Sequence, residues 1–574
     1  MEPLQHHAQQ WIDNDPDPQT RAAGQAILDS AEIDTLKDHF GGHLSFGTAG
    51  MRGALGPGPR RMNRAVVQRV GAGLARYVLS AVPEADGRCA VVGYDARHGS
   101  RVFAEDTACV LAAAGFSVVL FEEVAPTPCL AHAVVFMKAA VGVMVTASHN
   151  PAGDNGYKVY WSDGAQIIPP HDSGIADAID WQGPLPALPD LDALITQGTV
   201  GPMPAAGWED YLARVLALRV HPGVGGLRAI YTAMHGVGGQ TLQRVLKAAG
   251  HDDVRSVAAQ HEPDGSFPTV QFPNPEEPGA LDLAIADAEA CGADLVIAND
   301  PDADRLAVAL PGPGGQWGML TGDEVGALLA EDLLRFGEQA QARLVATTIV
   351  SSSMLSKIAD LHQAEYAETL TGFKWIASQA LAHSGPFVMG YEEALGYSIG
   401  DVVRDKDGIS AALLLLDLAA WAKSRGETLQ DQLAAIYRTH GLHRTRQRSI
   451  RMLGDAGAAR IAQLTSQLRS VPPAELGGAR VIRIRDIQAG TDLDLRTGQV
   501  DAVSLPVSNV IGLYLDDGSR VLVRPSGTEP KIKLYYEVVL QMGPSQTVAD
   551  AQAQADARID VLDTDLRTCM GIDG

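Results

Sequence analysis

The chain has 574 residues, more than one hydrophobic core usually organises, so several domains are expected. Apolar residues make up 46% and charged residues 20%, a balance that is typical of globular proteins and excludes a disordered or fibrous chain. The 45 basic and 69 acidic residues give a formal charge of −24, which argues against nucleic acid or an anionic membrane as a general partner.

The cysteines and the apolar runs bear on the compartment. Five scattered cysteines without a C-x-x-C pair fit a reducing compartment, and they fit neither a disulfide scaffold nor a structural zinc site. No basic region followed by an apolar stretch begins the chain, so no signal peptide is expected. The most apolar run, 411–422, contains Asp417 and is too short for a membrane span, which predicts a buried helix. A cytoplasmic location is therefore expected.

Strand and helix patterns alternate in the first part of the chain. Residues 89–95, 117–121 and 140–145 are short apolar runs that are typical of buried strands, and residues 99–115 place apolar side chains on one helical face. Strands rich in Val and Leu that are separated by helices indicate βαβ units and a mostly parallel sheet.

The same alternation recurs after a Pro- and Gly-rich stretch at 181–207, which is interpreted as a linker. Further buried strands are expected at 227–234, 294–298, 344–350 and 387–390. In the tail, residues 479–484, 510–515 and 531–539 alternate as in an antiparallel sheet. The chain is therefore interpreted as three α/β units and one α+β unit.

A polar loop follows the strand expected at 140–145 and reads TASHNP over residues 146–151. Its Ser148 is expected to be exposed and could serve as a nucleophile or a phosphoryl carrier, because α/β folds usually place their chemistry on such loops. The segment alone equally fits a polar turn in which Ser148 and Asn150 satisfy the backbone. The G-x-S-x-G elbow of serine hydrolases is absent, which disfavours that class.

A second loop follows the strand expected at 294–298 and reads DPDADR from Asp300 onward. Carboxylates at alternate positions of an extended segment point the same way, and Pro301 favours extension. The oxygens of Asp300, Asp302 and Asp304 would then suit a hard cation such as Mg²⁺. A solvated acidic turn is the alternative, but three like charges beside a buried strand are costly without a cation.

Two further loops combine charged and polar groups. Glu392 and Glu393 follow the strand expected at 387–390, and they could accept hydrogen bonds from sugar hydroxyls or equally form a solvent-facing turn. Near the C-terminus the chain reads RPSGTEPK from Arg524, which places a cation, two hydroxyls and a glycine within five residues. A tight hairpin turn would explain this segment, but the paired hydroxyls favour a phosphate-binding loop.

In order and spacing, these four loops resemble those of the α-D-phosphohexomutase superfamily, which includes phosphoglucomutase and phosphomannomutase, over residues 45–537. The resemblance implies an α/β protein with four domains around a central cleft: three related α/β domains with mixed sheets and a C-terminal α+β domain. The implied domains are 1–205 with the phosphoserine loop, 206–320 with the metal-binding loop, 321–440 with the sugar-binding loop and 441–574 with the phosphate-binding loop.

The resemblance also assigns roles to single residues. It implies that Ser148 is the phosphorylated residue and that Asp300, Asp302 and Asp304 bind Mg²⁺ together with it. The substrate-binding residues that it implies are Thr371, Gly372, Lys374, Glu392, Glu393, Arg524, Ser526, Gly527 and Thr528.

Further residues around the phosphoserine are implied in the same way. Arg52 lies in the segment SFGTAGMRG and is expected to contact the phosphoserine, while Lys158 matches a residue proposed in the family as a general acid or base. The segment at 405–408, DKDG, resembles a substrate-side segment of the third domain. The expected catalytic residues are Ser148, Lys158, Arg52, His149 and Arg305.

The implied activity is the interconversion of glucose 1-phosphate and glucose 6-phosphate, with glucose 1,6-bisphosphate as intermediate and activator. The acidic pair is followed by Ala-Leu-Gly-Tyr, whereas many hexose-specific members have Ser or His there. The preferred sugar is therefore not fixed by the resemblance. The alternatives are a phosphopentomutase, a phosphomannomutase or a glucose-1,6-bisphosphate synthase. A non-catalytic regulatory protein is disfavoured because the serine and the aspartates are all present. The expected partners are small sugar phosphates, without nucleic acid or membrane.

Overall fold

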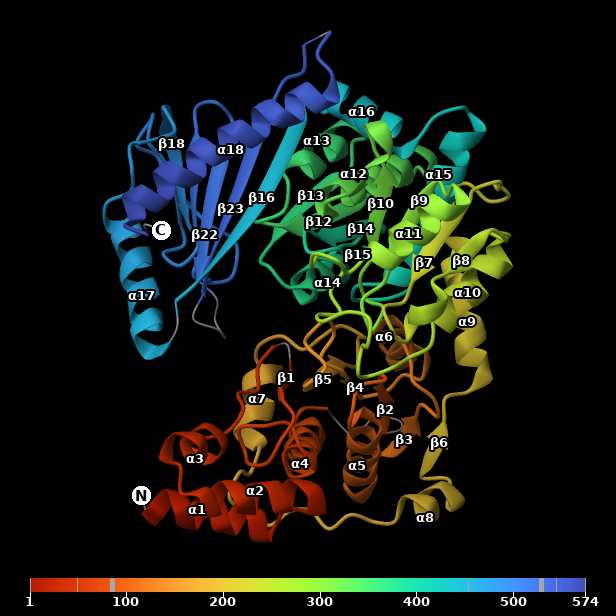
Figure 1. Ribbon diagram of the computed structural model, residues 1–574, viewed down its shortest axis with the longest axis vertical. Helices are drawn as coiled ribbons and strands as arrows, with labels where there is room; N and C mark the ends of the chain where they lie inside the picture. The colour runs from red at the N-terminus through yellow and green to blue at the C-terminus, as the bar shows by residue number, and fades with distance from the viewer. Residues whose placement is uncertain are drawn as a thin grey trace. The chain divides into compact units, whose positions relative to one another are not determined.

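A computed structural model describes residues 2–48, 50–82, 88–452, 454–525, 531–543 and 545–572 (Figure 1). The chain forms two compact units that are interleaved in sequence. The first comprises Met1–Thr321 and Leu395–Ser424, and the second comprises Gly322–Ala394 and Arg425–Gly574. Over the described ranges, every helix is too short or too polar to cross a membrane.

The first unit begins with the sheet that carries the serine loop. Its strands are β1 (Met51–Ala54), β2 (Cys89–Tyr94), β3 (Ser117–Leu120), β4 (Val141–Val145), β5 (Asp154–Trp161) and β6 (Val200–Pro202). They lie in the order β1-β5-β4-β2-β3-β6. Strands β4, β2, β3 and β6 run parallel, whereas β5 is antiparallel to both β4 and β1. Every residue of β4 is buried, as expected for a central strand between two helical layers.

Helices surround this sheet. They are α1 (Glu2–Asp13), α2 (Pro18–Ser30), α3 (Ile33–Phe40), α4 (Arg64–Ala81), α5 (Ser100–Ala113), α6 (Thr127–Phe136), α7 (His171–Ala178) and α8 (Leu191–Thr196). Helices α5 and α6 pack on the central strands, and α1 and α3 add Trp11, Leu36 and Phe40 to the same core. The strands and the helix predicted for this region are confirmed within one or two residues at each end.

The predicted linker at 181–207 is wrong. This stretch contains α8 and β6, and β6 pairs in parallel with β3 as the last strand of the sheet. Pro202 ends this edge strand, a position where a missing N–H removes no hydrogen bond from the sheet. The prolines and glycines therefore flank short elements instead of marking a boundary.

The second sheet of the first unit carries the aspartate loop. Its strands are β7 (Ala229–Thr232), β8 (Val254–Ser256), β9 (Leu295–Ala298), β10 (Ala307–Pro311) and β11 (Trp317–Met319). The order is β11-β10-β9-β7-β8, with β9, β7 and β8 parallel and β10 antiparallel to β9 and β11. Its helices are α9 (Ala205–Ala217), α10 (Gly238–Ala249), α11 (Asp282–Cys291) and α15 (Gly408–Ser424), and β15 (Gly396–Ile399) also belongs to the unit. The buried helix predicted at 411–422 is confirmed as α15.

The second unit begins with a parallel sheet. Its strands β12 (Leu344–Thr348), β13 (Glu365–Thr369) and β14 (Phe387–Glu392) pair in the order β13-β12-β14. Its helices are α12 (Gly322–Phe336), α13 (Met354–Leu361), α14 (Phe373–Ala382) and α16 (Leu429–His440). The loops after these three strands all leave at the carboxyl edge of the sheet, where open α/β sheets place ligands.

The C-terminal part of the second unit is α+β. Its strands are β16 (Leu442–Arg451), β17 (Glu475–Leu476), β18 (Ala479–Asp486), β19 (Thr491–Asp494), β20 (Val500–Ala502), β21 (Ile511–Leu515), β22 (Arg520–Pro525) and β23 (Lys531–Leu540). They pair antiparallel in the order β16-β23-β22-β21-β18-β19-β20, with β17 on β18. Helix α18 (Val548–Met570) crosses one face of this sheet, and α17 (Gly454–Ser470) packs beside β22 and β23 (Figure 1). The predicted fold class, three α/β domains and a C-terminal α+β domain, is confirmed.

Candidate active site

Ser148 lies on the loop between β4 and β5 and is held by hydrogen bonds. It has a left-handed φ of 53°, and its N–H donates to the hydroxyl of Thr146 at 2.9 Å. Its own hydroxyl donates to Oδ2 of Asp300 at 2.9 Å and lies 3.2 Å from Nδ1 of His149. Ser148 is only 2% exposed, so the expected exposure is wrong: the aspartate loop covers the hydroxyl.

A buried arginine supports the serine loop. Arg97 follows β2, and its Nη2 donates to the carbonyls of Ser148 at 2.6 Å and Asn150 at 2.5 Å. Its Nη1 donates to the carbonyls of Pro151 at 2.7 Å and Asp154 at 3.1 Å. The planar fork of guanidinium donors matches such a set of carbonyls, so one side chain fixes the shape of the loop.

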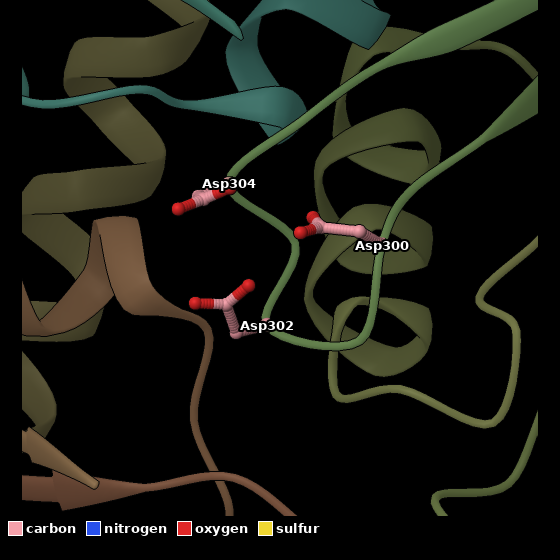
Figure 2. Close-up of side chains that lie close together, drawn as sticks. All are labelled: Asp300, Asp302 and Asp304. Carbon is pink, nitrogen blue, oxygen red and sulfur yellow. The ribbon is translucent and has the colours of Figure 1, made fainter. Parts of the chain in front are cut away.

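The three aspartates lie on the loop that joins β9 to β10, with their side chains close together (Figure 2). One carboxylate oxygen from each lies within 4.8 Å of the others, and all three residues are buried. The predicted extended conformation is wrong: Ala303 has a φ of 57°, and its N–H donates to the carbonyl of Asp300 at 2.9 Å, which closes a tight turn. The chain must reverse here because β9 and β10 are antiparallel neighbours.

Two lysines and a threonine contact the carboxylates. Nζ of Lys158 lies 2.6 Å from Oδ2 of Asp302 and 2.9 Å from Oδ2 of Asp304. Nζ of Lys406 lies 3.1 Å from Asp304, and the hydroxyl of Thr127 donates to Asp302 at 2.6 Å. Burial alone would lower the pKa of Lys158, but the carboxylates of Asp302 and Asp304 outweigh it and raise that pKa. Lys158 is therefore a charged ammonium in this arrangement.

The donor set of the loop suits a hard divalent cation. Among the described residues, Oδ1 of Asp302 and Oδ1 of Asp304 are buried and accept no hydrogen bond. Burial first, and then the neighbouring carboxylates of Asp304 and Asp302, raise the pKa of Asp300 well above its usual range. Carboxylate oxygens are the preferred ligands of Mg²⁺, so two orphaned buried oxygens beside a third carboxylate fit that ion.

Two arginines surround this cluster. Nε of Arg305 lies 3.9 Å from Asp300 and 3.8 Å from Asp304, and the main-chain N–H of Arg305 donates to Oδ1 of Asp300 at 3.1 Å. Arg52 lies on β1 opposite Gly156 of β5, the strand that also carries Lys158. Burial and then the charges of Arg305 and Arg52 hold the pKa of His149 well below its usual range. The structure therefore brings all five predicted catalytic residues into one cluster with the aspartates.

The acidic pair of the second unit is held by two other loops of its sheet. Glu392 ends β14, and its Oε1 accepts a hydrogen bond from the N–H of Gly372 at 2.7 Å. Oε2 of Glu393 accepts one from the hydroxyl of Ser351 at 3.0 Å. Gly372 has a φ of 117°, which a residue with a side chain rarely adopts. The loops after β13, β12 and β14 therefore meet around the two carboxylates.

The remaining predicted substrate residues lie in the same unit. The hydroxyl of Thr371 is buried without a hydrogen-bond partner in the described ranges, and Lys374 lies in the first turn of α14. Arg524 lies near the end of β22, opposite Lys533 on β23. Ser526, Gly527 and Thr528 lie outside the described residues, so most of the predicted phosphate-binding loop is not described.

Sequence reasoning missed several residues around both sites. Arg97, Thr127 and Ser351 were not predicted, although each comes shortly after a strand that ends at the carboxyl edge of its sheet. Lys406 was predicted only as part of a segment that resembles a substrate-side segment of the third domain, and its contact with Asp304 was not foreseen. Position relative to a strand end was the one signal that could have found them, because contacts between residues far apart in the chain leave no pattern in sequence.

Models of one family match four consecutive parts of the chain. Its phosphoglucomutase/phosphomannomutase alpha/beta/alpha domains I, II and III match residues 43–183, 209–314 and 321–440, and its C-terminal domain matches residues 488–543. In the solved structure of pp63/parafusin, a phosphoglucomutase from Paramecium, the fold is shared with a TM-score of 0.67 at 18% identity, over 92% of this chain and 95% of that one.

Three curated relatives carry different sugar names. A phosphopentomutase of Homo sapiens is 36% identical over 94% of this chain and 92% of its own. A phosphoglucomutase of Staphylococcus epidermidis is 37% identical over 86% of this chain and 90% of its own. A probable phosphomannomutase of Haemophilus influenzae is 42% identical over 83% of this chain and 93% of its own. With these relatives and four matched domains, the chain belongs to the phosphoglucomutase/phosphomannomutase family of the α-D-phosphohexomutase superfamily, whose members are phosphotransferase isomerases.

Proposed function

We propose that this protein interconverts glucose 1-phosphate and glucose 6-phosphate, with Ser148 as the phosphoryl carrier. The observation that carries the proposal is the hydrogen bond of 2.9 Å from the Ser148 hydroxyl to Asp300, inside a buried cluster of three aspartates. A serine hydroxyl and a metal-binding carboxylate set at this distance suit phosphoryl transfer, which depends mainly on positioning and on charge stabilisation.

Asp300, Asp302 and Asp304 would hold Mg²⁺ in the working enzyme. A bound Mg²⁺ supplies positive charge to phosphoryl oxygens and offsets the charge that builds during transfer. Arg305 lies 3.9 Å from Asp300, and Arg52 lies on β1 beside the strand that carries Lys158, so both cations would add to this stabilisation. The protein therefore provides cations close to the aspartate cluster that the serine hydroxyl contacts.

The proposed reaction has two balanced transfers. In the first, a sugar hydroxyl attacks the phosphoryl group on Ser148: the bond from phosphorus to Oγ breaks, a bond to the sugar oxygen forms, and the hydroxyl proton passes to a base. The sugar bisphosphate then reorients, and Oγ of Ser148 attacks its other phosphoryl group. The bond from that phosphorus to the sugar oxygen breaks, a bond to Oγ forms, and the proton released in the first transfer returns to the sugar oxygen as the isomeric monophosphate leaves. We assign the proton transfers to Lys158, which must first leave its ion pairs with Asp302 and Asp304 to accept a proton.

Substrate binding is assigned to the second unit. Glu392 and Glu393 would accept hydrogen bonds from ring hydroxyls, and two adjacent carboxylates can serve a sugar in either orientation. The segment around Gly372 would complete this surface, since its N–H already fixes Glu392. Arg524, with the loop that follows it, would bind the phosphate that does not react.

A pentose phosphate is the second candidate substrate. It is favoured by the phosphopentomutase of Homo sapiens, whose similarity extends over 94% of this chain, against 86% for the phosphoglucomutase of Staphylococcus epidermidis. A protein that makes glucose 1,6-bisphosphate from a separate donor would use the same serine and release the intermediate.

A coupled assay with Mg²⁺ and a trace of glucose 1,6-bisphosphate tests the proposal. Glucose 1-phosphate, mannose 1-phosphate and ribose 1-phosphate are compared by kcat/KM. A lead of about tenfold for glucose 1-phosphate, equivalent to about 1.4 kcal/mol in transition-state binding, supports the proposal. A lead for ribose 1-phosphate supports the second candidate, and turnover of none of them rejects the mutase activity.

A further inference from the structure

We infer that Ser351 is a positioning residue that fixes the carboxylate of Glu393, and that Arg520 of the C-terminal sheet in turn fixes Ser351. The inference rests on the proposed function, in which Glu393 binds sugar hydroxyls. It adds that the orientation of Glu393 is set by contacts from a different domain of the second unit.

The side-chain oxygen of Ser351 is saturated by three contacts. It donates to Oε2 of Glu393 at 3.0 Å and accepts from the N–H of Glu393 at 3.1 Å. The hydroxyl of Thr348 lies 2.8 Å away and is left to donate, because a hydroxyl has one proton and two acceptor positions. Thr348 also lies 3.4 Å from Oε2 of Glu393. One buried oxygen atom therefore holds Glu393 by its main chain and by its carboxylate together.

Strand pairing explains why these residues meet. Strands β12 and β14 are parallel neighbours, with Thr347 opposite Tyr391, so the chain leaves both strands at the same edge of the sheet. The N–H of Ser351 donates to the carbonyl of Thr348 at 3.0 Å, which turns the chain directly after β12. This turn brings the Ser351 hydroxyl beside the residue that follows β14.

Arg520 holds the turn from the C-terminal sheet. Its guanidinium donates to the carbonyl of Ser351 and lies 3.3 Å from the carbonyl of Ile349. Its other side is paired with the carboxylate of Glu537, which stands opposite Arg520 on β23. Arg520 is 6% and Glu537 is 2% exposed, so both charges are desolvated. Separating them would leave a buried charge unpaired, which costs free energy.

The same carboxylate holds the next part of the turn. Glu537 accepts hydrogen bonds from the hydroxyl of Ser352 at 2.9 Å and the N–H of Ser353 at 2.8 Å. Two residues of the C-terminal sheet thus hold the turn after β12. Arg520 binds carbonyl groups of the turn, and Glu537 binds its hydroxyl and N–H donors. A site that recognises hydroxyls needs its carboxylate held to a fraction of an ångström, which this chain of contacts provides.

A double-mutant cycle tests the inference. Ser351→Ala, Glu393→Gln and the double variant are assayed for kcat and KM with the preferred sugar phosphate. Ser351→Ala is expected to lower kcat/KM by about tenfold, and the double variant should be no worse than Glu393→Gln alone, because coupled residues do not add. Ser351→Thr keeps the hydroxyl and is expected to restore most of the activity.

Arg520→Lys tests the outer contact. Lysine keeps the charge beside Glu537 but has no planar fork for two carbonyls, so this variant should lower kcat/KM in the same direction as Ser351→Ala. Ser356→Ala is the matched control, because the Ser356 hydroxyl donates to the carbonyl of Ser353 on the same segment and is half-buried. It should leave kcat/KM within about twofold of the parent.

The outcomes separate the inference from the proposed function. Unchanged kcat/KM in Glu393→Gln overturns the assignment of Glu393 to the sugar and the inference with it. A clear loss in Glu393→Gln combined with additive effects of Ser351→Ala overturns the inference alone. Equal losses in Ser351→Ala and Ser356→Ala, matched by equal drops in thermal midpoint, also overturn it, because they indicate a general loss of folding.

Discussion

The guanidinium of Arg97 donates a hydrogen bond of 2.6 Å to the main-chain carbonyl of Ser148. Arg97 is 3% exposed, and its Nε lies 3.3 Å from the carboxylate of Asp95, so the donor is itself anchored beneath the loop. The serine that carries the proposed chemistry is therefore held at its main chain by Arg97 and at its hydroxyl by Asp300.

Arg97→Lys is expected to lower kcat by about a hundredfold, because one ammonium cannot reach all the carbonyls that the guanidinium holds and a small displacement of the serine is costly. Amide hydrogen exchange over residues 146–154 should speed up in the variant. Arg101→Lys, on the exposed side of α5, is the control and should match the parent in both measurements. A normal rate in Arg97→Lys would show that the loop keeps its shape without this contact.

Ser148→Ala is expected to abolish turnover, since no other group is proposed to carry the phosphoryl group. The parent protein incubated with labelled glucose 1,6-bisphosphate should retain label, and the variant should retain none. Ser173→Ala, an exposed serine on α7, serves as the control for both measurements. Near-normal turnover in Ser148→Ala would refute the carrier role.

Removal of Mg²⁺ by a chelator is expected to stop turnover, and added Mg²⁺ should restore it. Mg²⁺ at about 100 times its dissociation constant stabilises a folded protein by about 2.7 kcal/mol, which is visible as a rise in thermal midpoint. Asp304→Asn should lose this rise as well as the activity. Asp287→Asn, exposed on α11, should keep both, and a rise that persists in Asp304→Asn would place the ion elsewhere.

Asp323 predicts a pH dependence of stability. It lies in the first turn of α12 and accepts hydrogen bonds of 2.7 Å each from the N–H of Ser352 and the hydroxyl of Thr445. Burial, opposed in part by these hydrogen bonds, raises the pKa of Asp323 from 3.8 to about 7. The folded protein therefore binds a proton that the unfolded chain has already released, so stability falls as the pH rises from about 4 to about 7.

The loss would be about 4 kcal/mol at most, for a shift of about three pKa units. Asp323→Asn removes the titrating group and keeps an oxygen that can accept from Ser352. Between about pH 5 and about pH 8, the thermal midpoint of the parent should fall more than that of the variant. Parallel pH curves for the two proteins would contradict the raised pKa of Asp323.

The sequence predicted the elements well because apolar periodicity is a local property. The strand expected at 117–121 is β3, and the run 411–422 lies within α15. The sequence correctly predicted that the three aspartates lie close together, but it predicted an extended segment where the chain makes a tight turn. The turn at Ala303 follows from the antiparallel pairing of β9 and β10, which sequence spacing does not reveal. The role of Arg97 depends on carbonyls more than 50 residues away, and no residue type records such a contact.

The first unit is discontinuous in sequence, and this affects the order in which its parts are synthesised. Its last piece, Leu395–Ser424, is encoded after the first part of the second unit, yet it supplies Lys406 to the aspartate loop. Gly408 passes so close to Arg305 that an added Cβ would lie 2.2 Å from the Arg305 carbonyl oxygen. During synthesis, more than a hundred residues must therefore be added after the aspartate loop before Lys406 is available to contact Asp304. A fragment that ends at Thr321 would contain all three aspartates but would lack Lys406 and the rest of Leu395–Ser424, so it would not reproduce the metal site.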